Sequence, residues 1–225
     1  MSRSGILPLL LSVAFFTSAH ARAAELSAAD TTALLKNLQS HRVKNPSLTA
    51  DFTEQKASRL LAKPLVSQGT LSFQAPNKFR RELKGNNPSM TVSNGQTLWI
   101  YYPNFKEAEL YKMGQRAFFD DAIAALTAGL NLQHVADFYS IKAFDEGSDK
   151  YRLVLTPRTS GLRRLLRELT VWLHADLTID RTEAQLPKGD RIVTEYRNPR
   201  STSLPASTFE FTPPAGANVT QPLGK

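Results

Sequence analysis

Cysteine is absent from this chain of 225 residues, and several kinds of site are excluded with it. Without a thiol, the protein has no disulfide and no metal–thiolate centre. It also lacks the N-terminal cysteine to which a bacterial lipoprotein attaches its lipid anchor. Long apolar runs are scarce as well. The stretch over residues 5–16 is mostly hydrophobic, but it is too short for a good membrane span.

Catalytic sequence motifs are a second absence. The chain has no HExxH pair, no GxSxG elbow, no Walker loop and no GxGxxG run. His41, His134 and His174 are far apart in the sequence, and neighbours such as Asp120 and Asp121 point about 100° apart on a helix. We therefore expect no catalytic residues, no metal site and no cofactor, and we expect that the protein is not an enzyme.

The N-terminal segment has the pattern of a secretory signal peptide. Arg3 precedes the apolar run, and Ala21-Arg22-Ala23 fits an A-x-A cleavage site. The sequence therefore predicts a signal peptide over residues 1–23 and a single domain over residues 24–225. An uncleaved membrane anchor is the alternative, which the short run disfavours. An exported chain without a lipidated cysteine is expected to be free in solution, most simply in a bacterial periplasm.

The formal net charge is +8, and removal of Arg3 and Arg22 lowers it to +6. The basic residues are spread along the chain except for one cluster over residues 158–167. That cluster has no interleaved aromatic residues for stacking on bases, so we expect no nucleic-acid binding. A solvated face is the favoured interpretation of the cluster, and a docking surface for an acidic partner is the alternative.

Residues 27–43 are predicted to form a helix. Ser27 is a suitable N-cap, and Asp30 follows three residues later in capping-box spacing. Leucines then recur near the helical period, and Pro46 ends the pattern.

Short strands with alternating apolar and polar residues make up most of the remaining chain. Asn94-Gly95 between two apolar runs predicts a two-residue hairpin turn. Residues 115–138 have helical periodicity instead and should interrupt the sheet once. About eleven antiparallel strands, an N-terminal helix and a helical insertion predict a mainly-β α+β fold, either a barrel or a strongly curved half-barrel.

Several predicted strands are apolar on both faces. Leu98 and Ile100 alternate with Trp99 and Tyr101, whereas a sheet with one solvated face should alternate apolar with polar residues. Both faces therefore need cover. A barrel of this strand number can enclose a ligand cavity. A plain packed core with outer-face aromatics at a helix contact explains the same pattern, and the residues alone leave both interpretations open.

Five segments, found in the same order, resemble the periplasmic outer-membrane lipoprotein carrier family, LolA-like. They are ADFTEQK, SQGTLSFQAPNKFRREL, VSNGQTLWIYYP, YRLVLTP and FEFTPPAG. The resemblance covers essentially the whole mature chain. It implies an unclosed antiparallel β-barrel with a helical lid over an apolar cavity, in a monomeric carrier of lipoprotein acyl chains. The carrier would take cargo from an inner-membrane ABC release complex and pass it to an acceptor lipoprotein at the outer membrane.

The resemblance also implies which residues form the cavity and its lid. The predicted cavity lining is Phe52, Leu71, Phe73, Phe79, Arg81, Leu83, Val92, Leu98 and Ile100. The predicted lid residues are Phe118, Phe119, Ile123, Leu126 and Leu130. Each buried methylene is worth about 0.8 kcal/mol, so acyl chains need such a shelter in water. A lid held by weak contacts could open to release them.

Arg81 interrupts the predicted apolar lining, because it shares a strand face with Phe79 and Leu83. The family commonly has a Trp at this position, and an Arg that contacts the lid where this chain has Ala75. Three interpretations of Arg81 are open. It could replace that latch by donating to lid carbonyls, bind an anionic head group, or leave the barrel mouth and pair with a local acid.

Because Ala75 and Arg81 depart from the family pattern, roles other than lipoprotein transport stay open. A LolA-like paralogue could carry another amphiphile, such as a glycolipid or a polyene-type lipid, in the same barrel. A non-catalytic lipid or lipoprotein sensor is a further alternative, because a fold does not fix a function.

Overall fold

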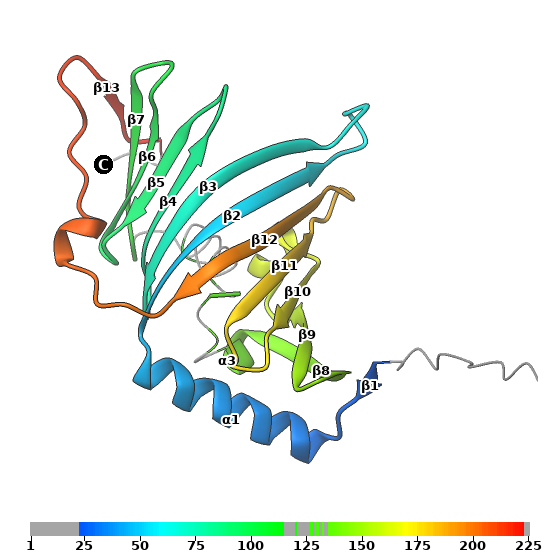
Figure 1. The fold of residues 1–225 in the computed structure, drawn as a ribbon. Coiled ribbons are helices and arrows are strands. Elements are labelled where there is room, and N and C mark those ends of the chain that lie inside the picture. Colours follow the sequence, from blue (N-terminus) through cyan, green and yellow to red (C-terminus); the bar gives the residue numbers. More distant parts are fainter. Residues whose placement is uncertain are drawn as a thin grey trace, which may run out of the picture.

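The computed structural model describes residues 23–114, 120, 127, 129, 130, 132 and 135–222. One sheet of 13 strands dominates it, in the order β1-β8-β9-β10-β11-β12-β2-β3-β4-β5-β6-β7-β13 (Figure 1). The strands are β1 (Ala24–Glu25), β2 (Ser47–Ala57), β3 (Leu65–Gln74), β4 (Lys78–Lys84), β5 (Ser89–Ser93), β6 (Thr97–Tyr102), β7 (Glu107–Lys112), β8 (Tyr139–Gly147), β9 (Lys150–Pro157), β10 (Glu168–Leu173), β11 (Ile179–Gln185), β12 (Arg191–Arg200) and β13 (Asn218–Thr220). The predicted signal peptide lies outside the described residues apart from Ala23.

The strands form an open, curved wall rather than a closed ring. Neighbouring strands pair antiparallel, except that β13 lies parallel to β7. Pairing of β12 with β2 joins two meanders, β8–β12 and β2–β7, into one sheet. This arrangement confirms the predicted mainly-β, unclosed antiparallel fold. The expectation of about eleven strands omitted β1 and β13, which have 2 and 3 residues and almost no sequence pattern.

The N-terminal helix is confirmed as α1 (Ala28–Lys44), and it lies along the end of the sheet at which β2 begins (Figure 1). Ser27 caps it: the Asp30 amide donates to Ser27 Oγ over 3.1 Å, and Ser27 Oγ donates to the Asp30 carboxylate over 2.6 Å. The other helices are α3 (Val135–Phe138), α4 (Ser160–Leu165) and the 3₁₀ helix η1 (Ala206–Phe209). Among the described residues, no helix combines the length and apolarity needed to cross a membrane.

The β5–β6 hairpin is present, but its turn lies one residue later than predicted. Ser93 pairs with Leu98, and the Asn94 amide donates to the Thr97 carbonyl over 3.2 Å. Gly95 and Gln96 are therefore the central residues, and Gly95 takes the positive φ of 90° that the turn needs. The Asn94 side chain accepts from the Gln96 and Thr97 amides, which is why Asn precedes the turn rather than entering it.

The hydrophobic core lies on the concave face of the sheet. Strand register places one continuous set of side chains there, from Tyr139 of β8 through Phe52 of β2 to Leu98 of β6. Leu34 and Leu38 of α1 pack into this core, together with side chains from the segment before β8, from α4 and from the C-cap residue of α4. Those further core members are Leu130, Leu132, Val135, Leu162 and Leu166.

The convex face of the β4–β7 half of the sheet is covered by the C-terminal segment, which includes the 3₁₀ helix η1. The Phe211 ring lies 5.7 Å from that of Trp99 and 5.5 Å from that of Tyr101, and Phe209 is buried. This cover explains why β6 is apolar on both faces.

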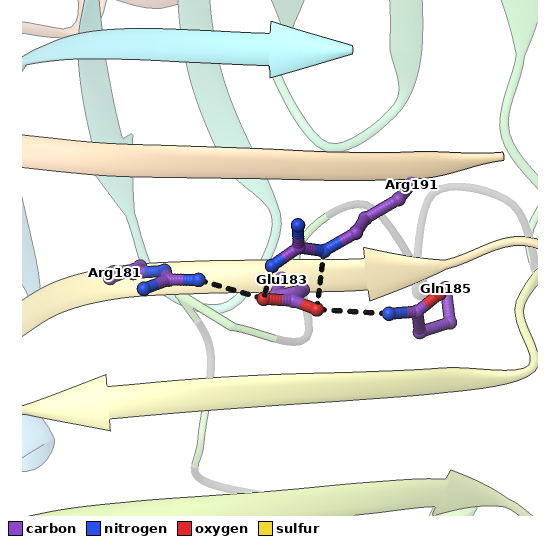
Figure 2. Close-up of polar contacts among 4 residues, drawn as sticks. All are labelled: Arg181, Glu183, Gln185 and Arg191. Carbon is purple, nitrogen blue, oxygen red and sulfur yellow. Dashed lines mark hydrogen bonds and ion pairs between the residues drawn. The ribbon is translucent and has the colours of Figure 1, made fainter. Parts of the chain in front are cut away.

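On the convex face of β10–β12, polar side chains form a network that needs no such cover. Glu183 accepts from Arg181, Gln185 and Arg191 (Figure 2). The outer face of the β4–β7 half is therefore covered by another chain segment, whereas the outer face of β10–β12 carries polar side chains that pair with one another.

Candidate cavity on the concave face

A cavity of about 130 Å³ lies on the concave face where the two meanders meet. It is lined by Phe52, Glu54, Leu71, Phe79, Arg81, Thr127, Leu130, Leu169, Thr182, Ala184, Ile192, Thr194 and Tyr196. Side chains from six strands and from the segment before α3 thus converge on one space. Most of that lining is apolar, with hydroxyls and a single pair of opposite charges among the side chains.

The predicted lining residues divide into two groups on this face. Phe52, Leu71, Phe79 and Arg81 line the cavity. Phe73, Leu83, Leu98 and Ile100 lie on the same face of the sheet but outside the cavity lining, within or against the core. The alternation of strand residues therefore identified the correct face for these eight, but not the extent of the cavity.

Val92 lies on the opposite face, which corrects its assignment to the lining. It pairs with Arg80 on one side and with Trp99 on the other, and both of these side chains point outward. Val92 is nevertheless buried. Its strand lies in the half of the sheet whose convex face is covered by the C-terminal segment, so an apolar side chain there need not face the cavity.

Sequence reasoning missed the far wall of the cavity, which β10, β11 and β12 supply. Ile192, Thr194 and Tyr196 alternate along β12, and this alternation was the available signal. Their relation to the first strands depends on the pairing of Thr194 with Glu54, residues 140 positions apart. No local pattern specifies such a pairing, so neither this wall nor Glu54 could be assigned from sequence.

Arg81 lies in the cavity wall and is paired within it. Its Nη2 lies 2.5 Å from Oε2 of Glu54, and its guanidinium lies 4.4 Å from the centre of the Phe52 ring. Thr194 Oγ1 is 3.5 Å from the same carboxylate oxygen. Only about a fifth of each charged side chain is exposed, 19% for Arg81 and 21% for Glu54. A charge pair and a cation–π contact together allow this Arg to sit in an apolar row.

Tyr196 is the other titratable group of the cavity. Burial raises the pKa of its phenol above the ordinary value, while a hydrogen bond with Thr182 and the charge of Arg81 act in the opposite direction. The phenol therefore stays neutral at physiological pH. With Arg81 and Glu54 compensating one another, the lining that the structure describes carries no net charge and suits a neutral, apolar occupant.

The described part of the predicted lid lies against the cavity. Thr127 and Leu130 belong to its lining, and Leu130 is 5% exposed. A Cβ on Gly129 would lie 2.8 Å from Cγ2 of Thr182, so only glycine fits this close approach to β11. Phe118, Phe119, Ile123 and Leu126 lie outside the described residues, and their role in a lid stays a prediction.

The described residues place one carboxylate in the lining of this cavity. They include no group of three or more His, Cys, Asp or Glu side chains placed to hold a metal ion. The single carboxylate of the lining, Glu54, is engaged by Arg81. The described lining is thus mostly hydrocarbon, and its two charged groups are paired with one another.

Comparison with known proteins agrees with this geometry. Residues 44–212 match the family described as "Outer membrane lipoprotein carrier protein LolA". The chain belongs to this family. A relative called outer-membrane lipoprotein carrier protein in Dechloromonas aromatica is 30% identical over 182 residues, 76% of this chain and 80% of the relative. One of the same description in Methylibium petroleiphilum is 31% identical over 172 residues, with the same coverages.

Solved structures share the fold of this LolA-family chain at low sequence identity. A conserved protein from Thermus thermophilus, described as uncharacterized, superposes with a TM-score of 0.50. The match covers 85% of this chain and 99% of that protein, at 12% sequence identity. This likeness supports the architecture alone, whereas the family assignment follows from the sequence match.

Proposed function

We propose that this protein is a periplasmic carrier that shelters the acyl chains of lipoproteins on the concave face of its sheet. The observation that carries the proposal is the apolar, charge-compensated cavity at the contact between the sheet and the segment ending at Leu130. Relatives at about 30% identity that are called outer-membrane lipoprotein carrier proteins support the same role. We assign it no catalytic step.

The cavity must enlarge to accept cargo. Its volume of about 130 Å³ is below the roughly 300–1,000 Å³ of pockets that hold small ligands. The segment through Thr127 and Leu130 is the element that could give way, because it forms one wall while hydrogen-bonded strands form the others. We propose that residues 118–130 act as a lid that moves off the sheet when acyl chains enter.

The salt bridge with Glu54 favours the third interpretation of Arg81, pairing with a local acid. Arg81 makes this pair within the cavity wall and not at a barrel mouth. In this role the pair keeps a polar spot neutral beside the acyl chains. The latch and head-group interpretations need the remaining guanidinium donors to reach the lid or a ligand, and we regard them as secondary.

The transport route is the finer part of the proposal. We propose an N-terminal signal peptide over residues 1–23, a single carrier domain over residues 24–225, transfer from an inner-membrane ABC release complex, and delivery to an acceptor lipoprotein at the outer membrane. Osmotic-shock fractionation and N-terminal sequencing of the mature chain test the first steps. A start near Ala24 in the periplasmic fraction is expected, and a cytoplasmic chain beginning at Met1 would contradict them.

The central experiment fills the cavity. Ala184 lines it, so Ala184→Trp should reduce uptake of a fluorescent acyl probe by about tenfold or more, because the indole occupies the binding volume. Ala28→Trp, at the exposed start of α1, is the matched control and should leave uptake unchanged. Equal uptake by both variants would place binding elsewhere.

Competition then separates the candidate cargoes. Displacement of the probe by a triacylated lipopeptide, but not by free fatty acids, supports lipoprotein transport. Displacement by glycolipids alone supports a paralogue that carries another amphiphile. Binding of no amphiphile at all would support a sensor. Mass spectrometry of lipids that co-purify with the protein gives an independent identification.

A compensating pair of substitutions tests the lid. Gly129→Ala places a methyl group against Thr182 Cγ2 and should push the segment away from β11, which speeds probe release several-fold. Thr182→Ser removes that Cγ2, so the double variant should regain the wild-type release rate. If the double variant releases the probe as fast as Gly129→Ala, the close approach does not hold the segment closed.

A further inference from the structure

The end of the β2–β3 hairpin exposes an unusual concentration of large apolar side chains. Leu60 is 94% exposed, Val66 63%, Leu65 56% and Leu61 37%. Single exposed leucines are ordinary on protein surfaces, but a group of this kind in one short segment marks an interaction site. We call residues 56–66 the hairpin tip.

Cations accompany these apolar residues. Lys56, Arg59 and Lys63 are all exposed in the hairpin tip. No Asp or Glu occurs between Glu54 and Glu82, so nothing within the tip compensates this charge. The tip therefore combines a net positive charge with exposed hydrocarbon, which complements a surface that is anionic outside and apolar beneath.

The hairpin tip projects beyond the strands beside it. β4 pairs with β3 only as far as Gln68 and Lys84, so residues 65–67 extend past the end of β4. On the other side, pairing with β12 reaches Ala57 and Arg191. The loop between β2 and β3 accordingly stands out at the upper right of Figure 1.

The apolar residues of the tip do not share one face. Leu65 and Val66 are consecutive in β3 and point to opposite sides of the sheet. A partner with a flat binding surface would cover one of them and leave the other in water. A lipid interface surrounds an inserted tip on every side, and it offers phosphates to the flanking cations.

We propose that the hairpin tip docks the protein on the surface of an anionic phospholipid bilayer. Leu60, Leu61, Leu65 and Val66 enter the boundary between head groups and acyl chains, while Lys56, Arg59 and Lys63 contact lipid phosphates. The contact is weak and reversible, because four side chains and three cations bury little area. It brings the end of β2 and the start of β3 to a membrane, and its existence does not depend on which cargo the cavity holds.

Vesicle binding by the mature chain without cargo tests the proposal. We expect flotation with phosphatidylcholine vesicles that contain about 30% phosphatidylglycerol and little flotation with phosphatidylcholine alone. Each cation near such a surface contributes about fivefold, so Lys56→Gln/Arg59→Gln/Lys63→Gln should weaken partitioning by about a hundredfold. Leu60→Ser/Leu61→Ser should weaken it by about tenfold or more.

Matched controls distinguish the tip from the overall basic charge. Lys36→Gln/Lys44→Gln removes two exposed cations from α1 and should change partitioning by less than about threefold. Unfolding midpoints equal to wild type show that each variant is folded. If the α1 variant loses as much binding as the tip variant does per cation removed, net charge and not the tip drives the association, and the proposal is wrong.

Site-specific fluorescence gives an independent readout, because the chain has no native cysteine to interfere with labelling. An environment-sensitive dye on Leu60→Cys should shift to the blue and brighten several-fold with anionic vesicles. The same dye on Val43→Cys, which is 66% exposed at the end of α1, should not respond. An unresponsive dye at position 60 would overturn the proposal. A response that grows with protein concentration in the absence of vesicles, together with elution as a dimer, would overturn it in favour of self-association.

Discussion

The two faces of the sheet carry the same group of side chains in different surroundings. Each face has an arginine that stacks on an aromatic ring and pairs with a glutamate. The inner cluster is Arg81, Phe52 and Glu54, with the guanidinium 4.4 Å from the ring centre and 2.5 Å from the carboxylate. The outer face has two such clusters, one of Arg152, Phe144 and Glu146 and one of Arg181, Trp172 and Glu183. In the second, which we call the outer cluster, the corresponding distances are 4.5 Å and 2.8 Å.

Their surroundings decide what each cluster does. Outside, Glu183 also accepts two hydrogen bonds from Arg191, and the pair becomes a surface network (Figure 2). Inside, Glu54 and Arg81 face an apolar space and compensate only one another. The outer cluster therefore contributes stability, whereas the inner one makes a charged strand residue compatible with a hydrocarbon cavity.

The largest loss of stability is expected at Gly69, whose lack of a side chain leaves room for the Phe52 ring of the inner cluster. A Cβ on Gly69 would lie 2.5 Å from the Phe52 ring and closer still to the Glu82 carbonyl oxygen. Gly69→Val should therefore lower the free energy of unfolding by about 3 kcal/mol or abolish folding. Gln68→Val, one residue along the strand and on the outer face, should change it by about 0.5 kcal/mol or less. Urea titrations followed by circular dichroism measure both.

Removal of the glutamate should lower the free energy of unfolding more in the inner cluster than in the outer cluster. Glu54→Leu leaves the Arg81 charge unpaired in the cavity and should destabilise the fold by about 2 kcal/mol. Glu183→Leu leaves guanidinium groups that water can reach, and about 1 kcal/mol is expected. The double variant Arg81→Met/Glu54→Leu should recover most of the inner loss, because no charge remains to be compensated. Equal losses at Glu54 and Glu183 would show that the cavity is as well solvated as the outer face.

Lowering the pH should reduce the stability that the outer cluster contributes. Hydrogen bonds from Arg191, followed by the other interactions of both arginines, hold the pKa of Glu183 below its ordinary 4.5. The stability from this depressed pKa is present above pH 4.5 and is lost as the pH falls through the lower folded-state pKa. The advantage of wild type over Glu183→Gln, about 1 kcal/mol at pH 7, should therefore shrink at acidic pH. A gap that stays constant in urea titrations from pH 7 to acid would contradict this assignment.

The smallest effect is expected at the most exposed member of the outer cluster. The Arg191 side chain is 45% exposed, so Arg191→Gln should lower the free energy of unfolding by about 0.5 kcal/mol. Screening should remove most of even that difference at about 1 M salt. Thermal unfolding of wild type and variant at low and high salt provides the measurement, and a loss that is insensitive to salt would indicate a packing role for Arg191.

Local sequence patterns predicted most of the strands and the inward direction of Arg81, because alternation is a property of a single strand. They also predicted the Ser27 cap, which depends on residues three positions apart. The same logic failed at Val92. An apolar outward position there requires knowledge of the cover provided by Phe209 and Phe211, more than a hundred residues later in the chain.

The cavity itself was only half predictable for a related reason. The wall from β2 to β4 could be assigned because those strands follow one another and share the segments that resemble the family. The wall from β10 to β12, and Glu54 as the partner of Arg81, depend on the pairing of β12 with β2. A short window of sequence does not specify which distant segments will pair, because the free energy of closing such a long loop depends on the whole chain between them.

The short strands β1 and β13 have a role beyond completing the sheet. A sheet that never closes into a ring has two open borders, and unpaired backbone groups at a border invite other chains to add to it. Here β1 occupies the border at β8, and β13 occupies the border at β7. These two short strands thus disfavour the addition of further copies of the chain at either border, although the sheet itself stays unclosed.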